Sequence, residues 1–183
     1  MRRMTSPASE PRRTPGRSLV LYPDPVLRRR ARPIETFDGW LRDLVADMRG
    51  LMRIHRGAGI AAPQAGESVR VFLAVSDDPE EEPTVFVNPR LHDFAGEIAL
   101  APEGCLSLPE IEGQVARSSE LSITAFDLEG REFTLRSAEF AARVWQHEMD
   151  HLDGVLIVDR MRSIDRLSNR KAIKELEQAH AGG

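Results

Sequence analysis

The sequence predicts a domain of the α+β class that is built on antiparallel β-structure. Three observations support this prediction: an amphipathic helical pattern lies early in the chain, several strand-like segments follow it, and a helix with a polar stripe comes after them. Strands and helices that are separated along the chain are typical of α+β proteins. With 183 residues, the chain is long enough for one domain with a real core.

Hydrophobic periodicity places the individual elements. Alternating segments around Leu128-Glu129-Gly130 predict a hairpin, and the acidic run 77–82 is interpreted as a solvated loop. The expected elements, in chain order, are a helix over 37–55 ended by the glycines of 57–59, strands over 69–75, 84–87 (closed by Asn88-Pro89), 120–126 and 131–135, a helix capped by Ser137 that ends near Gly154, a strand over 155–158 and a C-terminal helix from Ser163.

Composition excludes several classes of protein. A net charge of −4 argues against specific nucleic-acid binding, and no apolar run is long enough to cross a membrane. The single cysteine, Cys105, cannot form an intrachain disulfide and fits the reducing cytoplasm. Residues 1–18 are rich in Arg, Pro and Ser, so we expect a disordered tail rather than a transit peptide, followed by a single domain over 19–179.

The most informative segment is Gln146-His147-Glu148-Met149-Asp150-His151, which contains an H-E-x-x-H pattern. Residues four apart lie on one face of a helix, so His147 and His151 can bind one divalent metal ion. Glu148 lies beside the first histidine and can move the protons of a reacting water molecule. Because His and Glu are common on helix surfaces, a polar helical stripe is the alternative interpretation.

A catalytic metal site needs a third protein ligand. Glu175 has a suitable separation, but it lies among alternating charges that are typical of a solvated helix face. Cys105 stands next to a glycine, in a segment without a core pattern. A thiolate suits Fe²⁺ or Zn²⁺ and lowers the net charge of the site, so Cys105 is the predicted ligand rather than a small buried hydrophobe.

A glycine-rich segment, Gly57-Ala58-Gly59-Ile60-Ala61-Ala62-Pro63-Gln64, follows the first predicted helix. Its glycines permit close backbone approach and leave N–H and C=O groups able to pair with an extended peptide. The amide of Gln64 can donate a hydrogen bond to a developing oxyanion. The alternative is that the glycines only end the preceding helix and that Gln64 is an ordinary surface amide. Taken alone, this segment favours that alternative.

Together, GAGIAAPQ at 57–64, EGCLS at 103–107 and QHEMDH at 146–151 resemble, in order and spacing, the three motifs of the peptide deformylase family. The resemblance covers residues 19–167 and implies a catalytic domain in which antiparallel β-sheets pack around a central metal-binding helix. It also implies a metal-dependent hydrolase of the bacterial cytoplasm. Such an enzyme removes the N-formyl group from the N-terminal formylmethionine of nascent polypeptides and releases formate.

The resemblance further implies which residues carry the reaction. Cys105, His147 and His151 would hold the metal, with Fe²⁺ as the usual ion and Zn²⁺, Ni²⁺ or Co²⁺ as substitutes. Glu148 would act as the catalytic base and would later pass its proton to the leaving amine. None of these positions departs from the family motifs in this sequence.

Further residues would bind the substrate. The backbone N–H of Leu106 and the side chain of Gln64 would stabilise the oxyanion. Gly59 and Gly104 would hold the peptide as an added strand. Val144 would form a wall of the pocket for the methionine side chain.

The surroundings of the metal ligands are predicted in less detail. Metal-bound histidines usually donate their second N–H to an acceptor, and Glu103, Asp150 and Asp153 are candidates. The resemblance predicts that Glu103 pairs with Arg117. Two departures from the family pattern near the expected peptide groove, Glu112 and Arg143, are expected to alter side-chain preference beyond the methionine.

Alternatives stay open at this stage. The run Arg28-Arg29-Arg30 is interpreted as a solvated face, with a transient contact with ribosomal RNA as the alternative. An H-E-x-x-H endopeptidase that uses Glu175 as its third ligand is the rival enzyme. A catalytically idle homologue that binds peptide ends is the rival from a different functional class, and intact Glu148 and Gln64 argue against it.

Overall fold

The computed structural model describes residues 16–78 and 80–182, so most of the expected N-terminal tail lies outside it. Its strands are β1 (Gly59–Ala61), β2 (Val71–Ala74), β3 (Thr84–Cys105), β4 (Leu108–Phe126) and β5 (Glu132–Ser137). Its helices are α1 (Gly39–His55), α2 (Phe140–Leu152), α3 (Ile157–Arg160), α4 (Ser163–Ser168) and α5 (Arg170–Ala181), with short 3-10 turns η1 (Pro25–Arg28) and η2 (Ala62–Ala65).

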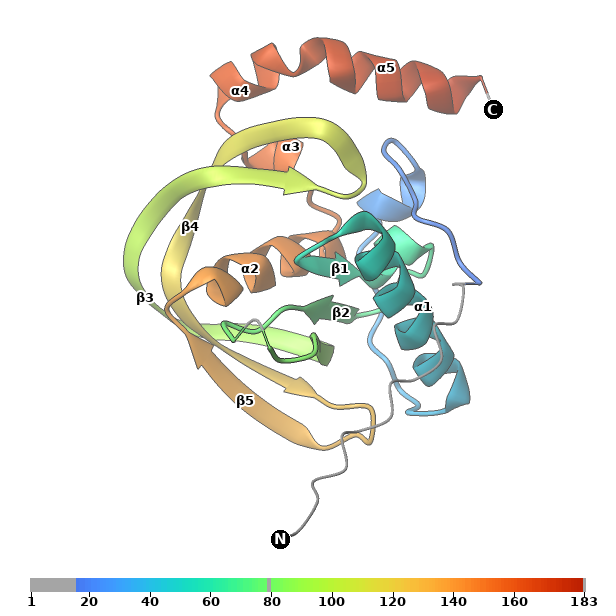
Figure 1. Ribbon diagram of the computed structural model, residues 1–183, viewed down its shortest axis with the longest axis vertical. Helices are drawn as coiled ribbons and strands as arrows, with labels where there is room; N and C mark the ends of the chain where they lie inside the picture. Colours follow the sequence, from blue (N-terminus) through green and yellow to red (C-terminus); the bar gives the residue numbers. More distant parts are fainter. Residues whose placement is uncertain (1–15, 79, 183) are drawn as a thin grey trace, which may run out of the picture.

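The five strands of the described residues form one antiparallel sheet in the order β1-β2-β3-β4-β5. β3 and β4 are long, and register shifts that follow Val87, His92 and Ala95 bend the pair into an arch. Figure 1 shows this arch curving around α2. The predicted class, α+β with antiparallel structure around the central helix, is therefore confirmed.

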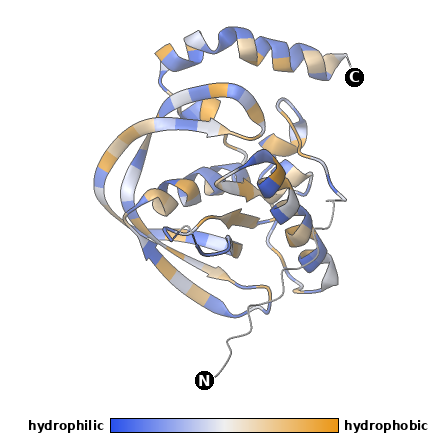
Figure 2. Ribbon diagram, in the orientation of Figure 1, coloured by the Kyte–Doolittle hydropathy of each residue, from blue (hydrophilic) through white to orange (hydrophobic). Residues whose placement is uncertain are grey.

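Alternation along β2 explains how both faces of the sheet are covered. Val71 and Leu73 belong to a core with α1, whereas Phe72 and Ala74 belong to a second core with α2, as the two-residue period of a strand requires. Figure 2 shows that β2 is mainly hydrophobic. Because β2 is buried on both faces, α2 lies against a part of the sheet that is itself fixed by packing.

The start of α2 differs from the prediction. Ser137 ends β5 instead of capping the helix. The cap comes from Asp77, which accepts hydrogen bonds from the Ser137 hydroxyl at 2.6 Å and from the backbone N–H of Ala141 at 2.9 Å. A carboxylate here satisfies a free N–H group and interacts favourably with the helix dipole. Part of the acidic segment that was taken as solvated thus has a structural role.

The predicted strand at 155–158 is also wrong. Residues 157–160 form the helical turn α3, because the side chain of Asp159 accepts a hydrogen bond from the backbone N–H of Leu156 at 2.9 Å. The predicted C-terminal helix is divided at Asn169 into α4 and α5. Apolar residues of α3 and α5 join those of β4 and η1 in a third core, which covers the end of the arch.

Two element boundaries are corrected as well. The strand from Thr84 continues through Asn88-Pro89, because Asn88 takes a left-handed conformation (φ 50°) at a register shift and the ladder then resumes. The first helix ends at His55 with the left-handed Arg56 as its cap, before the glycines begin. No helix within residues 16–78 and 80–182 combines the length and apolar character that a membrane span requires.

Replacing Phe86 by Ala tests the core that fixes α2. Phe86 is 1% exposed, and its ring centroid lies 4.7 Å from that of Phe72 and 5.8 Å from that of Trp145. Lost burial and the resulting cavity should lower the free energy of unfolding, measured with urea, by about 3–5 kcal/mol. Phe94, which lies on the same strand and is 56% exposed, provides the control. Phe94→Ala should change that free energy by less than about 0.5 kcal/mol, and equal losses would contradict the described packing.

Candidate metal centre

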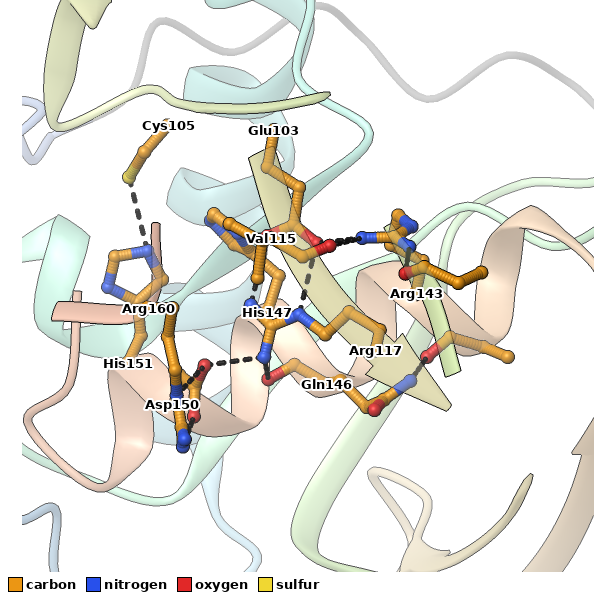
Figure 3. A network of polar contacts seen from close by, with 12 residues as sticks. Glu103, Cys105, Val115, Arg117, Arg143, Gln146, His147, Asp150, His151 and Arg160 are labelled. Atoms are coloured by element: carbon orange, nitrogen blue, oxygen red, sulfur yellow. Dashed lines mark hydrogen bonds and ion pairs between the residues drawn. The ribbon is translucent and has the colours of Figure 1, made fainter. Parts of the chain in front are cut away.

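Three potential metal ligands converge between α2 and the end of β3. His147 and His151 lie one turn apart on α2, with ring centroids separated by 5.0 Å. The sulfur of Cys105, the last residue of β3, lies 3.2 Å from Nε2 of His151 (Figure 3). The ligand atoms of all three residues lie within 4.8 Å of one another. The structure therefore brings the cysteine of one motif to the two histidines of another.

Glu148 is enclosed beside these ligands. It is 3% exposed, and its Oε2 atom has no hydrogen-bond partner among the described residues. Burial raises the pKa of the Glu148 carboxyl to about 7. The side chain lies directly over Gly59, where an added Cβ would come within 2.8 Å of the Glu148 carboxyl carbon. Glycine at this position of β1 therefore makes room for the carboxylate.

Gln64 points its amide at the same place. Its Oε1 accepts a hydrogen bond from the backbone N–H of Ala61 at 2.9 Å, which fixes the orientation of the side chain. Its Nε2 then faces the cysteine, donating to Ser107 Oγ at 3.1 Å and approaching Cys105 Sγ at 3.6 Å. The amide is buried, with 1% of the residue exposed. It is a donor held in place before any ligand arrives.

Glu103 links three cationic or imidazole groups. Its carboxylate accepts hydrogen bonds from Arg117 at 2.9 and 3.0 Å and from Arg143 at 2.6 Å, and it lies 3.1 Å from Nδ1 of His147 (Figure 3). Burial alone would raise the pKa of this carboxyl, but the hydrogen bonds from His147 and Arg117 lower it to about 2. The predicted Glu103–Arg117 pair is confirmed. Because Nδ1 of His147 is occupied, Nε2 is the atom left for a metal.

The other two predicted acceptors, Asp150 and Asp153, do not accept a hydrogen bond from a metal-binding histidine. Asp150 forms ion pairs with two arginines at 2.6 and 2.7 Å, and Asp153 pairs with Arg70 at 2.8 Å. Nδ1 of His151 has no partner among the described residues. Burial, reinforced by nearby cationic groups, lowers the pKa of His151 and keeps its imidazole neutral, which is the form that binds metals.

One cavity of about 410 Å³ opens above these groups. Eight of the nine predicted site residues line it, and the ninth, His151, lies just behind with 1% exposure. The lining residues among the predicted set are Gly59, Gln64, Gly104, Cys105, Leu106, Val144, His147 and Glu148.

Three further residues at the site, Ser107, Ile111 and Phe140, were not predicted to take part in it. The hydroxyl of Ser107 accepts a hydrogen bond from the side-chain amide of Gln64, and Ile111 and Phe140 line the cavity. Each carried a signal: Ser107 lies within the EGCLS motif, and Phe140 precedes Val144 and His147 at helical spacing. Ile111 belongs to the apolar pattern of β4, whose continuation to residue 108 was not predicted.

The donor set fits a metal ion. One thiol and two imidazoles surround a common point, and a buried carboxylate atom without a partner lies beside them. Unpaired buried polar atoms in a native protein usually face an ion or a water molecule. Glu175, the alternative third ligand, has a side chain that is 62% exposed on α5 and pairs with Lys171, so it is not part of this cluster.

Comparison with known sequences agrees with this geometry. The family model for polypeptide deformylases matches residues 17–167. A peptide deformylase of Desulforudis audaxviator is 41% identical over 146 residues, which cover 80% of this chain and 94% of that protein. The chloroplastic peptide deformylase 1B of Oryza sativa subsp. japonica is 40% identical over 169 residues, which cover 91% of this chain and 62% of the rice protein.

Solved structures agree as well. The peptide deformylase of Plasmodium falciparum superposes with a TM-score of 0.85 at 34% identity, covering 90% of this chain and 98% of that one. Arabidopsis thaliana peptide deformylase 1B in complex with an inhibitor gives a TM-score of 0.83 at 36% identity, covering 88% and 91%. The chain therefore belongs to the polypeptide deformylase family and is an enzyme that removes the N-formyl group from nascent peptides.

Proposed function

We propose that the cavity beside α2 is the active site of this peptide deformylase and that Cys105, His147 and His151 hold its metal ion. The convergence of one thiol and two imidazoles within 4.8 Å, next to the buried Glu148, is the observation that carries the proposal. Fe²⁺ is the proposed ion, with Zn²⁺, Ni²⁺ or Co²⁺ as substitutes, because thiolate and imidazole ligands suit these metals. When bound, the ion supplies the Lewis acidity that polarises a carbonyl and makes water nucleophilic near neutral pH.

Glu148 carries the proton in this proposal. Its carboxylate lies beside the ligand cluster and takes a proton from the attacking water molecule. It then passes this proton to the amine nitrogen of methionine, which leaves as formate is released. Because burial raises its pKa to about 7, the carboxyl can both accept and return a proton near neutral pH.

Gln64 and Leu106 stabilise the charge that develops on the formyl oxygen. The Gln64 amide is held in place by Ala61 with its Nε2 directed at the cavity floor near Cys105. Leu106 follows Cys105 and lines the same cavity, so its backbone N–H supplies the second donor in the proposal. Donors that are oriented before the reaction need no reorganisation when the negative charge appears.

The peptide binds along the edge of the sheet. Among the described residues, β1 is paired by β2 on one side, which leaves the other edge beside Gly59 for an added strand. Gly104 lines the same cavity, and in this proposal its backbone holds the peptide as well. Val144, which is 6% exposed, forms a wall of the apolar methionine pocket. The formyl carbon carries no side chain, so a narrow space beside Glu148 accepts it and excludes larger acyl groups.

Neither rival function fits the geometry as well. The endopeptidase hypothesis needs Glu175 as a ligand, but that side chain is exposed on α5 and paired with Lys171. The peptide-binding module without catalysis does not need the buried Glu148 or the oriented Gln64 amide, both of which lie in the cavity.

The cellular setting is proposed from the substrate. Nascent formylated chains are made where the bacterial ribosome works, so a cytoplasmic location and one catalytic domain over 19–179 are the expected arrangement. A transient contact of Arg28–Arg30 with the ribosome stays a prediction. Arg28 pairs with Asp159 and Arg30 lies 3.8 Å from Asp153, which favours the interpretation as a solvated, ion-paired face.

Formate release tests the proposed function directly. Protein loaded anaerobically with Fe²⁺ should release formate from formyl-Met-Ala-Ser. Glu148→Gln should retain the metal but lower kcat by at least about 100-fold, because the proton carrier is lost. Cys105→Ala should lose the metal, whereas the exposed control Glu175→Ala should keep both metal and activity. No release with Fe²⁺, Ni²⁺ and Co²⁺ would contradict the proposal.

A second prediction concerns the space above Glu148. In Gly59→Ala, the new Cβ would lie 2.8 Å from the Glu148 carboxyl carbon, so the carboxylate must move. We expect kcat to fall by roughly 10- to 100-fold while the metal content is unchanged, because a small displacement of a catalytic group is costly. Gly39→Ala is the matched control, since nothing lies within 4 Å of its added Cβ. Unchanged kcat in Gly59→Ala would remove Glu148 from the mechanism as described.

A third prediction concerns Glu103. Glu103→Gln removes the carboxylate that pairs with the buried Arg117, which keeps only its second pair with Asp150, and with the half-buried Arg143, and this should lower the free energy of unfolding by about 3 kcal/mol. It should also weaken Co²⁺ binding by roughly 10-fold, because the charged acceptor of the second nitrogen of His147 becomes a neutral amide oxygen. Glu132→Gln breaks an exposed pair with Arg90 and should cost less than about 1 kcal/mol. Native-like metal affinity in Glu103→Gln would show that the negative charge of Glu103 does not strengthen metal binding by His147.

A further inference from the structure

Two carboxylates lie unpaired at the mouth of the cavity. Glu110 and Glu112 of β4 both line it and are both exposed. Neither side chain forms an ion pair or hydrogen bond with a described residue. The nearby Arg143 also lines the cavity, but its guanidinium is bound to Glu103 and to backbone carbonyls at 2.7 and 3.0 Å. It is therefore not available to neutralise the two glutamates.

Glu112 is held beside the proposed path of the peptide. Its Cγ lies 3.6 Å, and its Oε1 3.9 Å, from the position that a Cβ on Gly104 would take. The strand beneath it is anchored, because the Glu112 carbonyl accepts a hydrogen bond from Asn169 at 2.7 Å and the Gln114 N–H donates to Asp165 at 3.1 Å. A peptide that pairs with the Gly104 backbone must therefore pass close to this carboxylate.

Glu110 occupies a strained position next to it. Its φ of 64° lies in the left-handed region that favours glycine, within the irregular stretch of β4 between Leu108, which pairs with Cys105, and Glu112, which pairs with Gly104. Residues held in such conformations are found preferentially at ligand sites, where the surrounding structure enforces them. Glycine would fit this backbone conformation more easily, but the chain has a glutamate here, and this residue lines the cavity.

The remaining charge at the mouth does not balance the two glutamates. Arg56, at the end of α1, lines the cavity on the side of Gly57 and contributes one positive charge. A formylated N-terminus carries no ammonium group, so the charge of the bound peptide comes from its side chains and its C-terminal carboxylate, and the carboxylate is the same in all the peptides compared below. The formyl end of the peptide is expected at the buried Oε2 atom of Glu148, which has no partner among the described residues. Glu110 and Glu112 line the exposed part of the same cavity, where the residues after methionine would lie.

We propose that Glu110 and Glu112 make this enzyme select formylmethionyl peptides with a lysine or arginine in the two positions after methionine, over peptides with acidic residues there. The inference rests on the proposed function, since it names the substrate class of the same cavity. Attraction to two exposed carboxylates acts mainly through faster capture of basic peptides and is weakened by salt.

The test compares kcat/KM for formyl-Met-Lys-Ser, formyl-Met-Glu-Ser, formyl-Met-Ala-Lys and formyl-Met-Ala-Glu, with formyl-Met-Ala-Ser as the neutral reference. At about 20 mM salt, the native enzyme should favour the lysine peptide of at least one pair by roughly five- to tenfold. At about 300 mM salt, where charges are screened over a few ångströms, the ratio should approach roughly twofold. The double variant Glu110→Gln/Glu112→Gln should bring the low-salt ratio close to one.

Glu97→Gln is the matched control, because Glu97 is exposed on β3 and is not part of the cavity lining. It should keep the native ratio. A native ratio near or below one for both pairs, with formyl-Met-Ala-Ser still turned over, would overturn the inference and leave the proposed function intact. An unchanged ratio in the double variant would also overturn it. No release from any peptide would instead overturn the proposed function. If the double variant does not fold, the salt dependence of the native ratio decides.

Discussion

The buried carboxylate of Glu103 is the interaction on which the rest of the site depends. It lies on β3, and its partners Arg117, Arg143 and His147 come from β4 and α2, so one side chain joins the arch to the metal helix. A buried charge costs several kcal/mol unless it is paired, and here the pairing requires all three elements to be in place. Folding of the arch and orientation of His147 are therefore coupled.

The same arch delivers the cysteine. Cys105 ends β3 two residues after Glu103, so the contact that fixes Glu103 also fixes the sulfur against His151. From the opposite side, the turn after β1 presents Gln64, whose amide is locked by a backbone hydrogen bond. The groups that would bind a metal and stabilise charge are thus held by secondary structure and packing before substrate arrives, which is what electrostatic catalysis requires.

Local sequence patterns predicted the candidate site residues better than they predicted the contacts between segments that are far apart along the chain. His147 and His151 could be placed on one helix face because that spacing is local. The approach of Cys105 depends on register shifts in β3, which periodicity does not encode. The cap of α2 comes from Asp77, sixty-odd residues away along the chain, so the nearby Ser137 was the wrong choice. A short apolar run such as 155–158 fits a strand or a buried helical turn equally well.

In the proposed metal centre, a thiolate and two imidazoles hold the ion. X-ray absorption spectroscopy of the Zn²⁺-loaded protein measures the ligand atoms directly. We expect one sulfur neighbour at about 2.3 Å and imidazole nitrogens at about 2.0 Å. A spectrum with only nitrogen and oxygen neighbours would exclude Cys105 as a ligand and with it the proposed metal centre.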